Sequence, residues 1–259
     1  MKDLVVIIPM HEFGKENIEL LNTAVESVPD DVKVVLSVKN GTDGKKLKGI
    51  SKRLEVISES ENDSFCELIN AAVDKIEEKW FSILEFDDTF TPIWLTNVQK
   101  YIEYMPDISV FMCLEDITDY NNKQYIGYGN EASWASSFSN TIGYIDNDCL
   151  QNYFDFYPTG SVFNTADWRE LGGLKPQIKL TFWYEWLLRA TNKSKQVFVI
   201  PKVLYNHRLG RKDSLTEKYK ETLNNDEVQF LFDLAKKEYF YHPSVERNPK
   251  NFVFEKTQE

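Results

Sequence analysis

The sequence has 259 residues, of which 42% are hydrophobic and 14% are aromatic. A chain of this size and composition can bury one large α/β core, so we expect a packed globular protein. Its net charge of −11 opposes general attraction to nucleic acid or to an anionic membrane, although it does not exclude a local basic groove.

The sequence lacks the features of an exported or membrane-spanning protein. No apolar run approaches the roughly 18 residues that cross a bilayer, and the first one, Leu4 to Ile8, stops at a proline without a small-residue cleavage site. The three cysteines, Cys66, Cys113 and Cys149, lie far apart without a CxxC spacing, which fits buried thiols in a reducing compartment. We therefore expect a cytoplasmic protein.

The first elements predict a βαβ unit. Leu4 to Ile8 is a continuous apolar run, typical of a strand covered on both faces of a parallel sheet. Glu16 to Val28 has apolar residues at helical spacing, and Val32 to Val38 is a second apolar run. The polar loop that follows, Lys39 to Gly44, is of the kind that binds ligands at the carboxyl ends of parallel strands. A plain turn explains it almost as well.

A third strand, a second helix and a central strand follow. Leu54 to Ser58 predicts the third strand. Ser64 to Ile76 has an apolar helical face, and Glu67 stands three residues after Ser64, the spacing of a capping box. Trp80 to Phe86 is a run of aromatic and branched apolar residues, which predicts a buried strand in the middle of the sheet.

Three acids stand at the end of this central strand. Residues two apart on a strand point to the same side, so we expect Glu85 and Asp87 to point together out of the sheet edge, with Asp88 at the turn. Clustered carboxylates repel one another unless a cation lies among them, and their hard oxygens suit Mg²⁺ or Mn²⁺ that bridges phosphates. The pattern therefore predicts a metal-diphosphate site. The alternative is an acidic strand exit in which Asp88 caps a turn.

Strands and helices continue to alternate as far as residue 114. Pro92 stands in the first turn of a helix that runs to about Tyr104, and Ile108 to Leu114 predicts the next strand. This alternation favours a mainly parallel, Rossmann-like sheet with helices on both faces. Glu115 to Tyr157 is rich in polar residues and has only short extended pieces, and we expect this insertion to set acceptor specificity.

One helix of the second half carries a candidate catalytic acid. After a strand at Thr159 to Asn164 and a short helix at Ala166 to Leu171, Phe182 to Thr191 predicts a helix with Glu185 among aromatic residues. Desolvation raises the proton affinity of a carboxylate in such surroundings, as a general base requires. The alternative is an ion pair with Arg189, four residues further along the helix.

Two short strands and a histidine come next. Gln196 to Ile200 and Val203 to Tyr205 predict the strands, separated by Pro201. His207, just beyond them, is a candidate metal ligand through a neutral imidazole, although a lone surface histidine is the commoner case.

The rest of the chain predicts a helix and a tail. A helix capped by Asp213 runs to about Tyr239, and the residues from Arg247 onward form a poorly ordered tail. Two basic stretches, at residues 45–53 and 208–212, are more often solvated faces than binding patches.

Taken in order, several of these segments resemble family-2 glycosyltransferases of the GT-A fold, from Leu4 to about Arg208. VVIIPMHE resembles the opening strand and its loop, NGTDG the loop that contacts the nucleotide, and LINAAV a helix segment that carries an asparagine. LEFDDTFTP resembles the metal motif, LGGL with FWYEWLLRA the segment that presents the base, and LYNHR the strand whose histidine completes the metal shell. Six segments in the expected order support one another.

The resemblance implies a role for each matching residue. Mn²⁺ or Mg²⁺ would be held by Asp87 with His207, and Glu185 would be the general base. The residues implied in binding the nucleotide sugar are Pro9, His11, Glu12, Asn40, Asp43, Asn70, Glu85, Asp87 and Arg208. Residues 1–212 would form the GT-A domain, with a nucleotide-sugar half at 1–115 and an acceptor half at 116–212, and residues 213–259 a helical extension and tail.

The implied activity is transfer of a sugar from a nucleoside-diphosphate sugar, with a UDP-sugar as the first choice, to an acceptor hydroxyl with inversion. The acceptor would be a saccharide, a glycoconjugate or a hydroxylated DNA base of phage type. One alternative is a sugar-phosphate nucleotidyltransferase, but its glycine-rich basic loop is poorly matched by MHEFGKEN after the first strand. The other is a non-catalytic module of the same fold that binds a sugar nucleotide or a protein.

Overall fold

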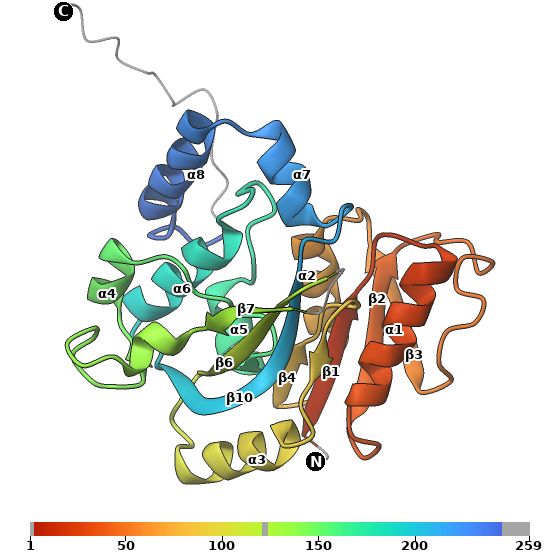
Figure 1. The fold of residues 1–259 in the computed structure, drawn as a ribbon, viewed down its shortest axis with the longest axis horizontal. Coiled ribbons are helices and arrows are strands. Elements are labelled where there is room, and N and C mark those ends of the chain that lie inside the picture. The colour runs from red at the N-terminus through yellow and green to blue at the C-terminus, as the bar shows by residue number, and fades with distance from the viewer. Residues whose placement is uncertain (1–2, 121–123, 245–259) are drawn as a thin grey trace, which may run out of the picture.

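In a computed structural model the protein forms a ten-stranded sheet flanked by helices, and the structure describes residues 3–120 and 124–244 (Figure 1). Along the sheet the strands follow the order β3-β2-β1-β4-β9-β6-β10-β5, with β7 paired to β6 and β8 paired to β10. The predicted α/β class with a central sheet is confirmed.

The first half of the sheet is parallel, as predicted. Its strands are β1 (Leu4–Pro9), β2 (Lys33–Lys39), β3 (Leu54–Ser60) and β4 (Trp80–Ile83), connected in part by α1 (Lys15–Ser27) and α2 (Phe65–Lys75). Every residue of β1 is buried because the strand is paired on both edges and covered on both faces. Val5 and Ile7 belong to the core on the side of α2, whereas Val6 and Ile8 belong to the core on the side of α1.

Strand directions are mixed in the second half, so the sheet is less parallel than predicted. β9 (Val162–Asn164) lies antiparallel between β4 and β6 (Val110–Asp119), and β10 (Val197–Leu209) runs parallel to β6. The remaining short strands are antiparallel partners: β5 (Thr89–Phe90) and β8 (Tyr144–Ile145) of β10, and β7 (Tyr125–Gly129) of β6.

β10 is one strand of 13 residues where the sequence predicted two. Pro201 lacks the N–H that a ladder needs, which is why a break was expected there. The register against β6 shifts between Ile200 and Val203, so the proline lies at an irregularity and the pairing resumes beyond it. This continuity carries the chain to His207 and Arg208 at the far end of the sheet.

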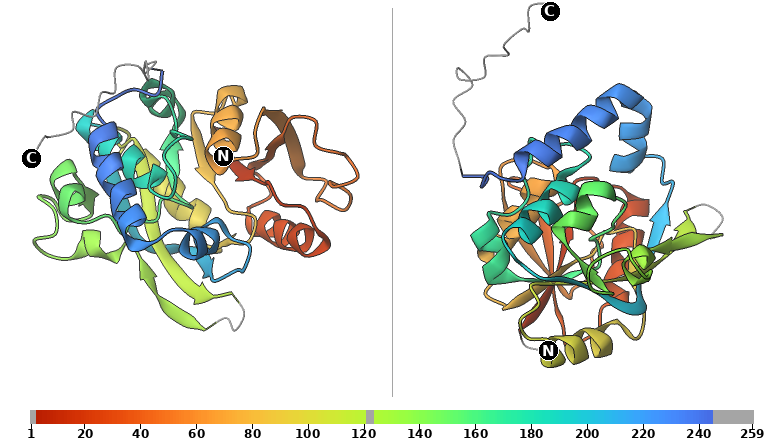
Figure 2. Two further views of the ribbon diagram at one scale, coloured as in Figure 1. Left: turned by 90° about the horizontal axis from the view of Figure 1, so that it is seen from above. Right: turned by 90° about the vertical axis from the view of Figure 1, so that its left-hand side faces the viewer.

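Helices cover both faces of the sheet. α3 (Trp94–Tyr104) begins two residues after Pro92 and lies below the sheet in the right-hand view of Figure 2. The others before residue 200 are α4 (Asn147–Asn152), α5 (Thr165–Leu171), α6 (Phe182–Asn192) and a 3₁₀ turn, η1 (Glu131–Trp134). The predicted bounds of α5 and α6 are therefore correct to within a residue.

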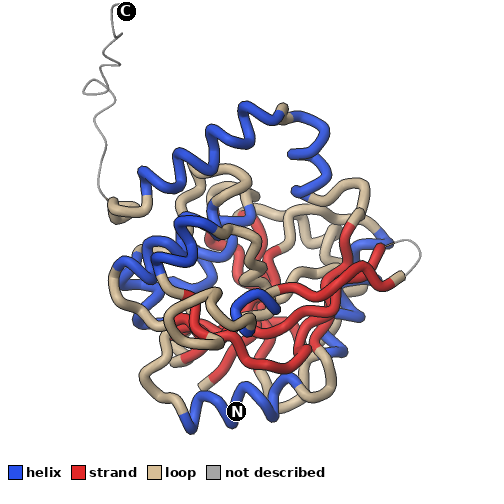
Figure 3. The backbone as a smooth tube through the Cα atoms, turned by 60° about the vertical axis from the view of Figure 1, so that its left-hand side comes forward, coloured by secondary structure: helices blue, strands red, loops and turns tan. Residues whose placement is uncertain are grey.

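The predicted C-terminal helix is divided into α7 (Leu215–Thr222) and α8 (Asn225–Glu238). The division falls at Asn224 because its side chain accepts from Glu227 N while the Glu227 carboxylate accepts from Asn224 N, a complete capping box. Figure 3 shows both helices lying across one end of the sheet. The predicted tail from Arg247 lies outside the described residues.

The described part of the chain, residues 3–120 and 124–244, contains no helix that is both long enough and apolar enough to cross a membrane. All three cysteines are free and buried, as predicted. Burial raises the pKa of the Cys66 thiol to about 12, so this thiol is protonated at neutral pH.

Candidate active site

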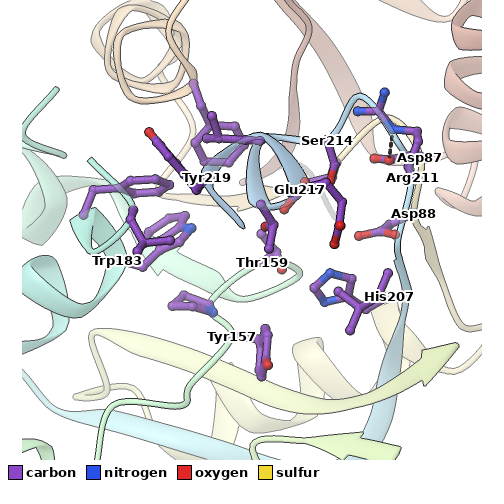
Figure 4. A pocket seen from close by; sticks show the side chains of 18 of the residues that line it. Asp87, Asp88, Tyr157, Thr159, Trp183, His207, Arg211, Ser214, Glu217 and Tyr219 are labelled. Carbon is purple, nitrogen blue, oxygen red and sulfur yellow. Dashed lines mark hydrogen bonds and ion pairs between the residues drawn. The ribbon is translucent and has the colours of Figure 1, made fainter. Parts of the chain in front are cut away.

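A cavity of about 370 Å³ opens at the carboxyl ends of β1, β4 and β10 (Figure 4). One side is formed by the residues that follow these strands, and the other by α6, α7 and the segment 154–159. Ligands of α/β proteins usually bind at this edge of the sheet, and pockets of about 300–1,000 Å³ are typical. The cavity is therefore the candidate active site.

The three acids that follow β4 all line this cavity. β4 ends at Ile83, before the predicted end at Phe86, and a turn follows in which Asp88 N donates to Glu85 O at 3.1 Å. The alternation expected for Glu85 and Asp87 on a strand was wrong in detail, because a turn and not a strand brings these side chains together.

Asp87 and Asp88 are buried, and Glu85 beside them is partly buried. Burial, followed by the charges of Asp88 and Asp87, raises the pKa of Glu85 to about 8. Burial and Asp87 also raise the pKa of Asp88 to about 6, although the charge of His207 opposes the shift. The raised pKa values show that negative charge is unfavourable on Glu85 and Asp88, a condition that a bound cation relieves.

Arg211 and Lys218 lie against these acids in a chain of ion pairs. Arg211 Nε donates to Asp87 Oδ2 at 2.6 Å, and its Nη1 donates to Glu12 Oε2 at 3.0 Å. Lys218 Nζ donates to Glu12 Oε1 at 2.5 Å. The Arg211 guanidinium also lies 4.9 Å from the centre of the Phe86 ring. Two cations from the end of β10 and from α7 are therefore held at the carboxyl ends of β1 and β4.

His207 lies beside the acids. Its Nδ1 is 3.0 Å from Glu115 Oε2. Burial favours the neutral ring, but Asp88 and Glu115 outweigh it and raise the pKa of His207 to about 10. Glu115 is fully buried, and its Oε1 has no partner within the described part of the chain. The sequence did not predict a role for Glu115, because β6 was expected to end at Leu114 and instead continues to Asp119.

The donor set fits a divalent cation in its chemistry. Asp87 and Asp88 offer hard oxygens, His207 offers an imidazole, and the unpartnered Oε1 of Glu115 is an uncompensated anionic atom nearby. Among residues 3–120 and 124–244, however, no group of three or more His, Cys, Asp or Glu side chains is already arranged to hold a metal. Binding a cation here requires Asp87 to release Arg211.

Only some of the residues expected to bind the nucleotide lie at the cavity. Pro9, His11 and Arg208 line the cavity, and Glu12 reaches it through Arg211. Arg208 also donates its backbone N–H to Asp88 Oδ1 at 2.8 Å. These residues are placed where a donor bound at the strand ends would lie.

Three other expected donor ligands do not line the cavity. Asn40 and Asp43 are in the loop after β2, where Asp43 Oδ1 accepts from Lys45 N at 2.9 Å. Asn70 bonds both ways with Leu174, donating from Nδ2 at 2.8 Å and accepting at Oδ1 at 2.9 Å. The structure thus gives Asn70 the role of fixing the segment before α6, and the expected ligand role is not supported by its position.

Glu185, the predicted general base, is also outside the cavity. Its side chain is 0% exposed, and Oε1 accepts from Arg189 Nε at 3.0 Å and lies 2.8 Å from Lys175 Nζ. Oε2 accepts from Arg189 Nη2 at 2.8 Å. This position does not support the predicted role as a base, because the carboxylate is buried, has both oxygens engaged and does not line the cavity. The alternative prediction, an ion pair with Arg189, is confirmed.

Comparison with known proteins identifies the type of fold. No protein-family model matches the sequence, and no curated protein matches it significantly. Solved structures do match. Residues 1–349 of S. aureus TarS in complex with UDP-GlcNAc superpose with a TM-score of 0.60 at 14% identity, over 93% of this chain and 68% of that one. The mannosyltransferase PcManGT from Pyrobaculum calidifontis, in complex with GDP-Man and Mn²⁺, superposes with a TM-score of 0.62 at 13% identity, over 91% and 64%.

This chain has the GT-A-type fold of nucleotide-sugar glycosyltransferases. The fold predicted from the motif order is thereby confirmed. At these identities the likeness establishes the fold alone, and the chain spans only 44% of the longer TarS structure. The function of this protein therefore depends on the residues that line its cavity.

The structure also brings into the cavity residues to which the sequence gave no role. Arg211 belongs to a basic stretch interpreted as a solvated face, and Trp183 and Glu217 carried no signal. Their positions depend on how α6 and α7 lie against the strand ends, and no local pattern encodes that.

Proposed function

We propose that this protein is a glycosyltransferase that moves a sugar from a nucleoside-diphosphate sugar to an acceptor hydroxyl, with a divalent cation and with inversion at the anomeric carbon. One observation carries the proposal: three strand-end acids, the guanidinium of Arg211 and a histidine converge on one cavity of a glycosyltransferase fold. The complexes of TarS with UDP and UDP-GlcNAc and of PcManGT with GDP-Man and Mn²⁺ support the choice of donor and metal.

In this proposal the nucleotide and the diphosphate lie along the strand ends. Pro9 and His11 line the side on which the base and ribose would bind, with Glu85 toward the ribose. Arg211 and Lys218, which here neutralise Asp87 and Glu12, are the cations that a diphosphate would recruit. A UDP-sugar is the first choice of donor.

A bound Mn²⁺ or Mg²⁺ would be held by Asp87 with His207, and it would neutralise charge on the diphosphate. The protein residues orient the metal ligands and bind the diphosphate. Glu115 orients the imidazole of His207, and Arg208 N fixes the carboxylate of Asp88. Arg211 offers a guanidinium to the diphosphate oxygens on which negative charge develops as the sugar leaves.

Release of the nucleoside diphosphate tests this proposal. The protein is incubated with UDP-glucose, UDP-GlcNAc or GDP-mannose, with Mn²⁺ or with EDTA, and UDP or GDP is measured. Slow release to water is expected for at least one donor with Mn²⁺, falling about 100-fold or more in Asp87→Ala. Failure of all donors to bind would refute the proposal, and equal release in EDTA would refute the role of the metal.

A further inference from the structure

The cavity has two chemically different ends. The charged end contains Asp87, Asp88 and Arg211. The other end is lined by aromatic rings from the segment 154–157 and from α6, α7 and α8: Phe154, Phe156, Trp183, Tyr184, Tyr219 and Phe232. In Figure 4, Trp183 and Tyr219 lie on the side of the cavity away from Asp87 and Arg211. A donor bound by the charged end leaves the aromatic end for another ligand.

Trp183 and Tyr219 are held in place by their neighbours. The Trp183 ring stacks on Phe163 with an interplanar angle of 9° and 5.8 Å between centroids. Tyr219 lies close to the backbone of Leu180, and both residues line the cavity. Leu180 has a φ of 59°, the left-handed region that residues other than glycine rarely adopt. Both rings are only partly buried, so they form an oriented aromatic wall.

Glu217 of α7 lines the same cavity, and Figure 4 draws it between the two ends. It stands three residues after the N-cap Ser214, whose Oγ accepts from Glu217 N at 3.2 Å. At the same position in α8, Glu227 turns its carboxylate back to the N-cap backbone and completes a capping box. In α7 that backbone N–H, of Ser214, donates to Arg211 O instead. The Glu217 carboxylate is therefore not used in capping α7, and it can interact with a ligand in the cavity.

The Glu217 carboxylate is placed to accept a proton. Within residues 3–120 and 124–244, Oε1 accepts from Lys220 Nζ at 2.6 Å, and Oε2 has no hydrogen-bond partner. The other acids of the lining follow β4, among the groups that the donor uses. Glu185 is buried in its own ion pairs. Glu217 is thus the one acid of the described lining that stands apart from the charged end.

We propose that Glu217 is the general base, and that the acceptor is a sugar whose ring stacks on Trp183 and Tyr219. This inference rests on the proposed function. A pyranose ring has one face of C–H groups, whose positive hydrogens are attracted to the negative face of an aromatic ring. Its hydroxyl groups lie at the edge of the ring, so stacking directs one of them toward the middle of the cavity, where Glu217 lies.

The chemical step balances without a further reactant. The Glu217 carboxylate takes the proton of the acceptor hydroxyl while that oxygen forms a bond to the anomeric carbon of the donor. The bond from the anomeric carbon to the diphosphate oxygen breaks, and its electron pair stays on the nucleoside diphosphate. Glu217 leaves the step as a carboxylic acid and returns its proton to water.

The test compares Glu217→Gln with Glu221→Gln, an exposed glutamate one turn further along α7. Glutamine keeps the size of the side chain and the backbone N–H that caps α7, so the fold is retained, which the midpoint of thermal unfolding checks. The acceptor probes are methyl α- and β-pyranosides of glucose, galactose, mannose and N-acetylglucosamine. We expect kcat for transfer to fall at least about 100-fold in Glu217→Gln, with unchanged affinity for the donor, and to stay unchanged in Glu221→Gln.

The aromatic wall is tested by Tyr219→Leu, which keeps an apolar side chain but removes the ring from a helix without buried residues. The KM for the glycoside is expected to rise about 3- to 10-fold with little change in kcat. The inference is overturned if Glu217→Gln retains transfer within about threefold of wild type. It is also overturned if the protein binds and hydrolyses the donor but glycosylates only a serine peptide or hydroxymethylated DNA. Absence of donor binding in the wild type would instead refute the proposed function, and this inference with it.

Discussion

Replacing Glu185 by alanine separates a structural role from a catalytic one. The substitution leaves Arg189 and Lys175 buried, each with 2% of its side chain exposed and without their shared carboxylate. Arg189 also donates to the carbonyl oxygens of Leu171 and Gly173, and Lys175 donates to that of Glu238 at the end of α8. The carboxylate therefore stabilises a junction between α6, the loop before it and α8.

The expected loss of stability is large. Removing one partner of a buried ion pair typically costs about 3–5 kcal/mol, because the other charge stays buried without compensation. A chain of this size loses about 2–4 °C in its unfolding midpoint for each kcal/mol, so Glu185→Ala should lower the midpoint by roughly 6–20 °C. Since folded proteins have only about 5–15 kcal/mol of stability, much of the total would be lost.

Thermal and urea unfolding measure this loss, with Glu103→Gln on the exposed side of α3 as the control. Donor turnover is then measured below the lowered midpoint and corrected for the folded fraction. We expect kcat of the folded variant to stay within a few fold of wild type, because Glu185 does not line the cavity. A normal midpoint together with a kcat reduced about 100-fold would show that Glu185 acts in the reaction, against the structure.

Three further predictions concern other parts of the molecule. Gly160→Ala should cost about 2–5 kcal/mol in urea unfolding, because φ is +74° and the new Cβ would lie 2.4 Å from the Tyr205 ring, whereas Gly127→Ala has no atom within 4 Å to meet. Arg211→Met should weaken donor binding by calorimetry about 10-fold or more, since a charge-assisted hydrogen bond is worth about 1.5–3 kcal/mol; an equal effect from exposed Lys212→Met would contradict this. Burial raises the pKa of the Cys66 and Cys149 thiols to about 12, so both stay protonated at pH 8 and should react with a thiol reagent only after unfolding; rapid labelling of the native protein would be inconsistent with that burial.

The fold could largely be predicted from local pattern. The apolar pattern identified the first four strands, α2 and α6. Of these, β1, β2, β4, α2 and α6 bury apolar residues that their own sequences define. The direction of β9 could not be predicted, since a three-residue strand pairs antiparallel only through its neighbours β4 and β6. The continuity of β10 past Pro201 also depends on its pairing with β6.

Some residues of the candidate site could also be predicted from the sequence, and others could not. The acids that follow β4 were visible because three carboxylates stand directly after an apolar run, and in the structure all three line the cavity. The buried ion pairs of Glu185 could not be predicted, because a helical glutamate among aromatic residues has the same sequence pattern whether it faces a cavity or an arginine. Glu217 was missed because α7 has no buried residue, so nothing in its pattern indicates that it lies over the strand ends.

The most direct test of the central claim is a calorimetric titration of UDP-GlcNAc, UDP-glucose or GDP-mannose into the wild type and Asp87→Ala, each with Mn²⁺ and with EDTA. The central claim is that the acids after β4 bind a cation, which in turn binds the diphosphate of the donor. Mn²⁺ should therefore strengthen binding of one donor to the wild type by about tenfold or more. Asp87→Ala should lose that increase and keep the weaker affinity measured in EDTA. Donor binding that is the same with and without Mn²⁺, or an increase that survives in Asp87→Ala, would contradict the account.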